Sequence, residues 1–232
     1  MNMIDITFDV SSDTPEGKDV DSHSPTLRRY HQQLWSKPLP NGMIFQLNTN
    51  QPRSYLHHQS ELGEFILASD AISHTFRTWK RMSTLISQVP AHKIESFRAL
   101  ARTIGGYMVF PGKKINNKPT INGMRGISPR IQDRFDLTLE CIRLYYINKP
   151  SPLTEVLQRY GSFFNLFEDF RGYVDFFLLQ DLVDDGYAST KFCLPFTSFD
   201  QSPVPSTVEE YLTYRDNMMA FVAGRNQRML KY

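Results

Sequence analysis

The chain has 232 residues, of which 41% are hydrophobic and 22% are charged. This balance excludes an intrinsically disordered chain and supplies enough apolar side chains for a sizeable core. The formal net charge is only +2, yet residues 93–130 carry eight basic residues against one acidic residue. Such a segment suits an anionic partner, unless neighbouring acidic segments pack beside it and neutralise its charge.

Prolines and glycines interrupt residues 11–60 so often that only short elements fit between them. We expect a turn of helix around residues 27–35 and a short strand around residues 43–47. Leucine and aromatic side chains recur in this stretch, which indicates an ordered segment. Residues 1–60 are therefore predicted to form an irregular N-terminal wrap packed on the rest of the domain.

The next elements are more regular. Residues 65–68 form a short apolar run typical of a strand, and Ser69 or Asp70 is placed to cap a helix that continues through residue 86 until Pro90 stops it. A second helix is expected over residues 91–103. Gly105 and the glycine after it end this helix, and the apolar residues that follow predict a strand.

The second half of the chain has clear helical periodicity, with apolar residues recurring every three or four positions. Before it lies a polar loop that is long for a compact domain, and loops of this length are usually functional or disordered. The expected elements are a strand at 107–110, the loop at 112–129, a helix from 130 to 147, a helix that Ser151 caps, a central helix at 173–183, a strand at 191–196, and a last helix behind a capping box of Ser206 and Glu209.

Together these elements predict an α+β fold, a predominantly helical single domain over residues 1–232 with about five to six helices and a small β component. The most apolar stretch is too short to span a bilayer, so no membrane association is expected. Cys141 and Cys193 each lie in an apolar segment, which is typical of buried free thiols in a reducing compartment. We therefore expect a cytoplasmic protein.

The polar loop is the strongest candidate for a binding site, because none of the recognised catalytic motifs is present. It contains Lys113, Lys114, Arg125 and Arg130 among glycines and asparagines. Lysine and arginine attract phosphate, and glycine lets the backbone approach a ligand closely. These four residues are the predicted phosphate-binding set. The alternative is a solvated surface loop.

Acidic residues follow directly after this loop. Asp133, Asp136, Glu140 and Arg143 have the spacing of one helix face. Paired carboxylates can perform acid–base chemistry, so Asp133 and Glu140 are the candidate catalytic residues. The alternative is a water-facing row of charges. No metal site is predicted, and the sequence indicates no particular cofactor.

Two further carboxylates, Asp175 and Asp181, interrupt the most apolar segment. A buried carboxylate needs a partner, since otherwise its pKa rises and it becomes neutral. Arg159 and Arg171 are near enough in sequence to pair with them as structural salt bridges. The functional alternative is an acid that reaches a cleft.

Several stretches resemble a bacterial family of unknown function, and the resemblance covers most of the chain. It implies a bacterial, single-domain protein and brings no activity, cofactor or site residue. The stretches are residues 24–31, 34–40, 120–126, 133–143 and 176–183.

We therefore expect a protein that binds or acts on a phosphate-bearing ligand, a nucleotide or nucleic acid, through its basic 93–130 segment. The competing hypothesis is a non-enzymatic protein–protein interaction module, in which the aromatic-rich wrap and the acidic second half contact a protein partner. Whether the protein is an enzyme stays open at this point.

Overall fold

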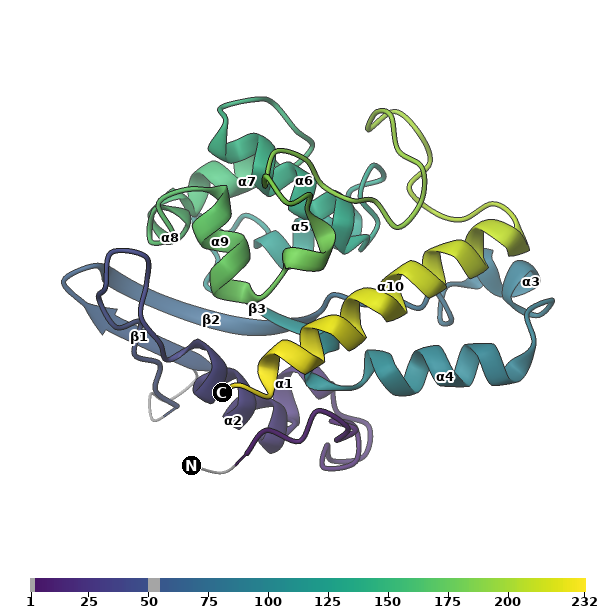
Figure 1. Cartoon of the computed structure of the whole chain (residues 1–232), viewed down its shortest axis with the longest axis horizontal. Coiled ribbons are helices and arrows are strands. Elements are labelled where there is room, and N and C mark those ends of the chain that lie inside the picture. Colours follow the sequence, from purple (N-terminus) through teal and green to yellow (C-terminus); the bar gives the residue numbers. More distant parts are fainter. Residues whose placement is uncertain (1–2, 50–54) are drawn as a thin grey trace.

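The computed structural model describes residues 3–49 and 55–232. An antiparallel three-stranded sheet in the order β1–β2–β3 crosses the middle of the molecule (Figure 1). Leu67 of the central strand lies opposite both Leu56 and Pro111. The strands are β1 (Leu56–Ser60), β2 (Gly63–Ala71) and β3 (Tyr107–Pro111).

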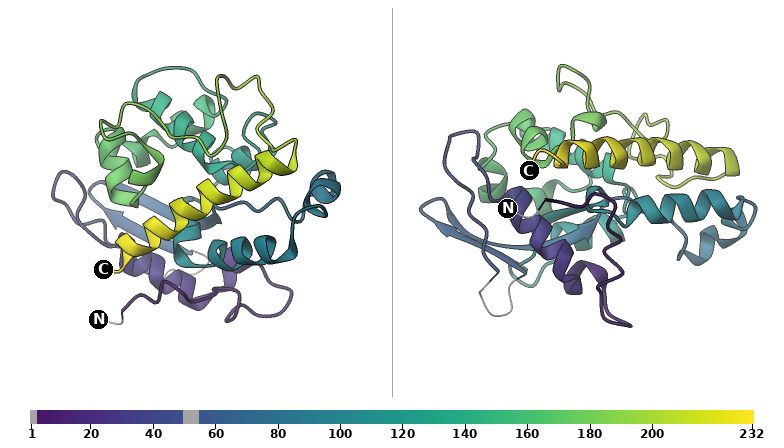
Figure 2. Two further views of the ribbon diagram at one scale, coloured as in Figure 1. Left: turned by 45° about the vertical axis from the view of Figure 1, so that its right-hand side comes forward. Right: turned by 60° about the horizontal axis from the view of Figure 1, so that its bottom comes forward.

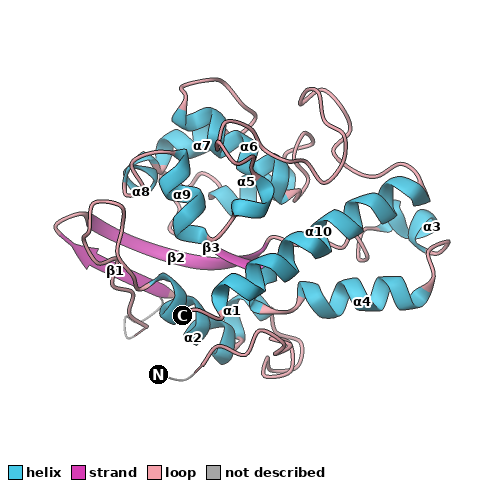
Figure 3. Ribbon diagram, in the orientation of Figure 1, coloured by secondary structure: helices cyan, strands magenta, loops and turns pink. Residues whose placement is uncertain are grey.

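Helices make up most of the regular structure in the described part of the chain (Figure 3). Ten are α-helices, of which several are short, and three more segments are 3₁₀ turns. The α-helices are α1 (Val20–His23), α2 (Pro25–Trp35), α3 (Ser83–Ile86), α4 (Ala91–Ala101), α5 (Ile121–Ile127), α6 (Phe135–Tyr146), α7 (Thr154–Arg159), α8 (Gly161–Asn165), α9 (Phe170–Phe177) and α10 (Val208–Met229).

The helices cover the sheet from two sides. Figure 1 shows α5–α9 gathered on one side of the sheet, with α1 and α2 on the other. The long α10 runs beside α4 and brings the C-terminal end next to α2, as both views of Figure 2 show. Segments from the two ends of the chain thus meet at one place.

The buried hydrophobic side chains form a single cluster that extends from Ile4 to Met229. Cys141 and Cys193 are free and buried within it, as predicted. No helix of the described residues is long and apolar enough to cross a membrane. The prediction of one domain over residues 1–232 stays a prediction.

The predicted α+β, mostly helical class is confirmed, and so are α2, α4 and β3. The expected irregular wrap contains two capped helices, α1 and α2, and ends in β1, which the sequence did not predict. At α2 the hydroxyl of Ser24 accepts a hydrogen bond from the N–H of Leu27, and Pro25 occupies the first position. Residues 1–2 and 50–54 of the wrap lie outside the described residues.

The prediction of a helix that begins at Ser69 or Asp70 was wrong. The strand that precedes it is longer than expected, because Asp70 pairs with Met108 and Ala71 with Tyr107 across the sheet. Backbone pairing with β3 therefore decides the conformation of residues that have good helix-capping side chains. The helix that follows is only the short α3.

Other boundaries also differ. The predicted loop over residues 112–129 contains α5, where the hydroxyl of Thr120 caps the helix by accepting a hydrogen bond from the N–H of Gly123. Residues 43–47 and 191–196 form no strand. Isolated bridges at Pro38–Ile44, Asn48–His57 and Val183–Thr190 lie in or next to them.

Three helix ends are placed differently from the sequence expectation. α6 begins at Phe135 instead of residue 130, and α9 ends at Phe177, where Leu178 adopts a left-handed conformation with φ of 59°. The residue that caps α10 is Thr207, whose hydroxyl accepts a hydrogen bond from the N–H of Glu210. The capping box is thus one residue later than predicted.

Candidate functional site

The structure does not gather the predicted phosphate-binding residues around one cavity. Lys113 and Lys114 are exposed on the loop after β3. Arg130 is 57% exposed and lies 3.4 Å from a carboxylate oxygen of Asp200. Arg125, by contrast, is completely buried. The four side chains therefore occupy separate environments, although three of them remain accessible to an anion.

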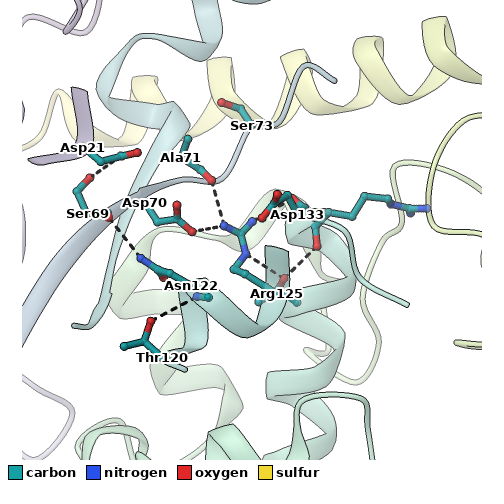
Figure 4. Close-up of polar contacts among 12 residues, drawn as sticks. Asp21, Ser69, Asp70, Ala71, Ser73, Thr120, Asn122, Arg125 and Asp133 are labelled. Atoms are coloured by element: carbon teal, nitrogen blue, oxygen red, sulfur yellow. Dashed lines mark hydrogen bonds and ion pairs between the residues drawn. The ribbon is translucent and has the colours of Figure 1, made fainter. Parts of the chain in front are cut away.

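Arg125 is held by acceptors of the protein itself (Figure 4). Its guanidinium donates hydrogen bonds to the carboxylate of Asp70, to the carbonyl of Ala71 at 3.1 Å and to the carbonyl of Asp133 at 3.0 Å. Its Nε–H donates to the hydroxyl of Thr138 at 3.3 Å. This arginine ties α5 to β2 and to the start of α6. Four of its five N–H groups are used within the protein, and the side chain is fully buried, so it is not accessible to an external phosphate.

The two candidate catalytic carboxylates differ in burial: Asp133 is half-buried and Glu140 is buried. Asp133 lies in the turn before α6, in a left-handed conformation with φ of 62°. The carboxylate of Glu140 accepts hydrogen bonds from Arg143 at 2.7 and 2.8 Å and from the hydroxyl of Thr190 at 2.9 Å. Glu140 is buried, and its neighbour Asp136 is fully buried. A water-facing row of charges is therefore wrong for this face of α6.

Asp21 and Asp70 form an acidic pair near Arg125 that the sequence did not indicate. Asp21 of α1 points toward Ser69, and Asp70 points toward Arg125 (Figure 4). Burial and the nearby carboxylate of Asp70 raise the pKa of Asp21 to about 7. Burial raises the pKa of Asp70 as well, although the adjacent guanidinium acts in the opposite direction.

Lys37, a titratable group with a shifted pKa, lines one cavity of the molecule. The cavity has a volume of about 510 Å³ and is bounded by residues 37–40, by residues 167–169, by one face of α9 and by Tyr232. These segments come from three distant parts of the chain. The walls are mainly apolar, and a few charged side chains interrupt them.

Lys37 is positioned by the backbone that follows α2. Its carbonyl accepts a hydrogen bond from the N–H of Phe45 at 3.0 Å, and the N–H of Leu39 donates to the carbonyl of Met43 at 2.8 Å. These contacts close the segment into a hairpin-like loop with prolines at 38 and 40. The loop holds the lysine at the edge of the cavity.

The Lys37 ammonium lies among aromatic rings. Its Nζ is 5.2 Å from the ring centroid of Trp35, 4.8 Å from that of Phe176 and 4.6 Å from that of Tyr232. The same nitrogen is 3.5 Å from the hydroxyl of Tyr232. In the described part of the chain, no carboxylate forms an ion pair with it.

This environment changes the protonation of Lys37. Burial, assisted by the buried Arg225 guanidinium, lowers the pKa of Lys37 to about 7. The ring faces attract the charged form, whereas the low polarity favours the neutral amine. Both forms are therefore accessible near neutral pH, which is unusual for a lysine.

The opposite wall of the cavity is the first half of α9. The carboxylate of Asp169 caps this helix by accepting a hydrogen bond from the N–H of Gly172 at 2.7 Å. A Cβ atom at Gly172 would lie 2.1 Å from the carbonyl oxygen of Phe167 and 3.0 Å from Cγ of Pro40. Only glycine permits this close approach, so Gly172 fixes the distance between the two walls.

Asp175 supplies a second polar group on this wall. One of its oxygens accepts hydrogen bonds from the hydroxyl of Tyr187 at 2.7 Å and from the amide of Gln180 at 2.9 Å. Arg171 lies 3.7 Å from its other oxygen and is largely exposed. The predicted pairing of Asp175 with Arg171 is confirmed, but the pair lies at the surface and lines the cavity.

A family model matches residues 4–229, which is nearly the whole chain, and its description is a family of unknown function, DUF6994. The chain belongs to DUF6994. This agrees with the resemblance noted from the sequence. No curated protein and no solved structure matches the chain. The family gives no activity, so the chemistry of this DUF6994 member has to be argued from its own side chains.

Among the described residues of this DUF6994 chain, no three His, Cys, Asp or Glu side chains are grouped so that they could hold a metal ion. The second acid of the apolar segment, Asp181, pairs with Arg228 of α10 and not with Arg159. It therefore contributes to the docking of α10.

Sequence reasoning missed the Lys37 cavity in this DUF6994 member because its parts are far apart. The stretch Trp35–Pro40 contains a lysine next to an aromatic residue and two prolines, which by itself predicts only a turn. The other two rings, Phe176 and Tyr232, come from α9 and from the segment after α10. No local pattern records that they meet.

Proposed function

We propose that this protein binds a small organic molecule in the cavity beside Lys37, with the Lys37 amine as the group that contacts the polar end of the ligand. Pockets for small molecules usually measure about 300–1,000 Å³ and combine apolar walls with a few polar groups. The Lys37 cavity, at about 510 Å³, fits this description.

The observation that carries the proposal is the Lys37 amine itself. A lysine that only supports the fold at a surface is expected to extend into water or to pair with a carboxylate. Lys37 instead lies over three aromatic rings at a cavity wall and forms no ion pair within the described residues. Titratable groups with strongly shifted pKa values in a cavity are candidates for functional residues.

The walls indicate the kind of ligand. Pro38 and Pro40 are exposed and offer apolar surface to an organic body, while Arg171 and Asp175 offer charge at the rim. A molecule with an apolar body and a polar end, at which Lys37 donates or accepts a hydrogen bond, matches both. A long polymer does not fit into a cavity of this size.

Binding of a phosphate-bearing ligand, as expected from the sequence, stays a prediction. Fewer observations support it than support binding in the Lys37 cavity. Lys113, Lys114 and Arg130 are accessible, but the buried Arg125 guanidinium donates its hydrogen bonds to acceptors within the protein. Accessible lysines and arginines on a loop are also what a solvated surface requires. The interaction-module hypothesis likewise stays a prediction.

Retention and exchange of ligands test the proposal. The purified full-length chain is measured by native mass spectrometry for co-purifying small molecules, and a library of small aromatic and aliphatic acids, alcohols and amines is screened by ligand-observed NMR. We expect binders whose affinity falls at least tenfold in Lys37→Met. The matched control Lys113→Met changes an exposed lysine in the same way and should leave affinity unchanged. Equal binding by both variants, or no binder at all, contradicts the proposal.

A further inference from the structure

We propose that Lys37 forms a covalent imine with an aldehyde or ketone that enters the cavity beside it. This inference rests on the proposed ligand site and assigns its substrate class. It follows from the position of the Lys37 amine, from its neighbours and from the absence of a competing carboxylate partner in the described residues.

The first requirement for imine formation is a neutral amine with a free lone pair. Lysine becomes nucleophilic when it is desolvated or placed near another cation. Both conditions hold here, because three aromatic rings lie near Nζ and the buried guanidinium of Arg225, 5.5 Å from the ring centroid of Trp35, acts on the same amine. An ion pair would keep the ammonium charged, and none is formed within the described residues.

The second requirement is a route for protons. The Nζ of Lys37 attacks the carbonyl carbon, and its proton passes to the carbonyl oxygen to give a carbinolamine. Loss of that oxygen as water, with the second amine hydrogen, forms the C=N bond, so the reaction needs no oxidant or reductant. The hydroxyl of Tyr232, 3.5 Å from Nζ, is within reach to relay these protons.

The third requirement is space for the body of the carbonyl compound. Phe176 and Phe167 pack against each other, with ring centroids 5.0 Å apart, and together they close one end of the cavity. The exposed rings of Pro38 and Pro40 form the rest of the apolar wall, on which the body of the compound would rest. Arg171, which is 69% exposed, stands at the rim where a carboxylate on the same compound would emerge. Small aromatic or branched aliphatic carbonyl compounds therefore suit the cavity best.

Several charged groups around Lys37 influence its titration. Arg225 of α10 favours the neutral amine, and Asp175 of α9 favours the ammonium. Arg171 is paired with Asp175, and Asp169 is occupied as the cap of α9. Burial is the largest influence, and together with these groups it keeps the neutral amine of Lys37 present near pH 7.

Reductive trapping tests the inference on the wild-type full chain. The protein is incubated with benzaldehyde and sodium cyanoborohydride from pH 6 to pH 10, and the benzylated lysines are located and quantified by peptide mapping. We expect Lys37 to be modified at least ten times faster than Lys113 at pH 7, with a half-maximal rate near pH 7 for Lys37. Because both lysines belong to one molecule, no variant has to fold.

A parallel NMR measurement with benzyl alcohol, which has no carbonyl group, separates this inference from the proposed function. Binding of benzyl alcohol at the cavity together with preferential modification of Lys37 supports both. Binding without preferential modification overturns the imine and leaves the ligand site standing. If benzyl alcohol does not bind and Lys37 reacts no faster than Lys113, both are overturned.

Discussion

The indole Nε1–H of Trp35 donates a hydrogen bond to Nδ1 of His31 at 3.0 Å, and this contact fixes the tautomer of the histidine. Because indole is only a donor, Nδ1 must be unprotonated and Nε2 carries the proton. Nε2 lies 3.0 Å from the hydroxyl of Ser69, which in turn donates to Asp21 at 3.2 Å. Burial lowers the pKa of His31 to about 3, so the neutral ring persists at ordinary pH. A directed chain of hydrogen bonds thus leads from the core of α2 to the acidic pair.

We expect Trp35→Phe to destabilise the protein by about 2–4 kcal/mol, because it leaves Nδ1 of the buried His31 without a donor and opens a cavity in the core. Urea unfolding followed by circular dichroism measures the change. Trp79→Phe is the control, since Trp79 is only half-buried, and it should cost clearly less. Equal losses in the two variants would contradict the role of the Trp35–His31 contact.

Replacing Arg125 tests whether it supports the fold. Arg125→Met should cost about 3–5 kcal/mol, because it leaves the Asp70 carboxylate and two carbonyls without their donor. Arg130→Met removes an exposed pair with Asp200 and should change stability by less than about 1 kcal/mol. Equilibrium unfolding in urea compares them. A small effect at Arg125 would show that the buried network contributes little.

The fold class was predictable because it depends on local periodicity. The apolar stripe of α2, the run of β3 and the glycine pair after α4 are all visible along the chain. The end of β2 was not, because Ser69 and Asp70 have the side chains of a helix cap and their strand conformation comes from pairing with β3. Cross-strand hydrogen bonds to residues nearly forty positions away leave no trace in the local sequence.

The candidate site was less predictable for the same reason. Arg125 is a basic residue among glycines, which indicates a ligand loop, yet its acceptors lie on β2 and before α6 and bury it. Of the three rings near the Lys37 amine, Trp35 alone is close to it in sequence, and the other two belong to Phe176 and Tyr232. The chemistry of both residues is decided by segments that meet only in the folded chain.

The acidic pair predicts a pH-dependent stability. The pKa of Asp21 is about 7 in the folded protein against 3.8 for an ordinary aspartate, so the folded state prefers the neutral acid. The stability that this preference provides is present below pH 4 and is lost as the pH rises through 7. Asp21→Asn keeps an acceptor for Ser69 and carries no charge. We therefore expect it to be more stable than wild type at pH 8 by about 1 kcal/mol or more, and to differ less at pH 4.

Thermal unfolding at the two pH values measures this difference, which corresponds to a few degrees in Tm for a protein of this size. Asp185→Asn is the matched control, because Asp185 is exposed, and it should show no such pH dependence. A variant at Asp21 that is less stable at pH 8 than wild type would contradict the prediction.

Gly172 should tolerate no side chain. In Gly172→Ala the new Cβ would collide with the backbone of Phe167, so α9 must move away from the loop that carries Pro40. We expect a loss of more than about 2 kcal/mol together with weaker binding in the cavity. Gly123→Ala is the control within another helix, where the nearest atom to the Cβ is 3.4 Å away. It should be neutral or slightly stabilising, because alanine favours helix.

Finally, the charged form of the Lys37 side chain should make the folded protein less stable. Its folded pKa is about 7 against 10.5 for an ordinary lysine, so the folded state disfavours the ammonium. The stability associated with the neutral amine is present above pH 10.5 and is lost as the pH falls through 7. Lys37→Met keeps an unbranched side chain over the rings and removes the charge. Relative to wild type, we expect it to gain more stability at pH 6 than at pH 9, by about 1 kcal/mol or more.

Urea unfolding of wild type, Lys37→Met and Lys113→Met at both pH values checks this expectation. Lys113 is exposed, so Lys113→Met removes no buried group and should change the stability only slightly at both pH values. A site that binds or reacts through a desolvated amine is expected to cost stability in this way, because function requires the group that the fold disfavours. If Lys37→Met instead loses stability at pH 6, the attraction of the aromatic rings for the ammonium exceeds the cost of burial, and Lys37 is then a structural cation and not a nucleophile.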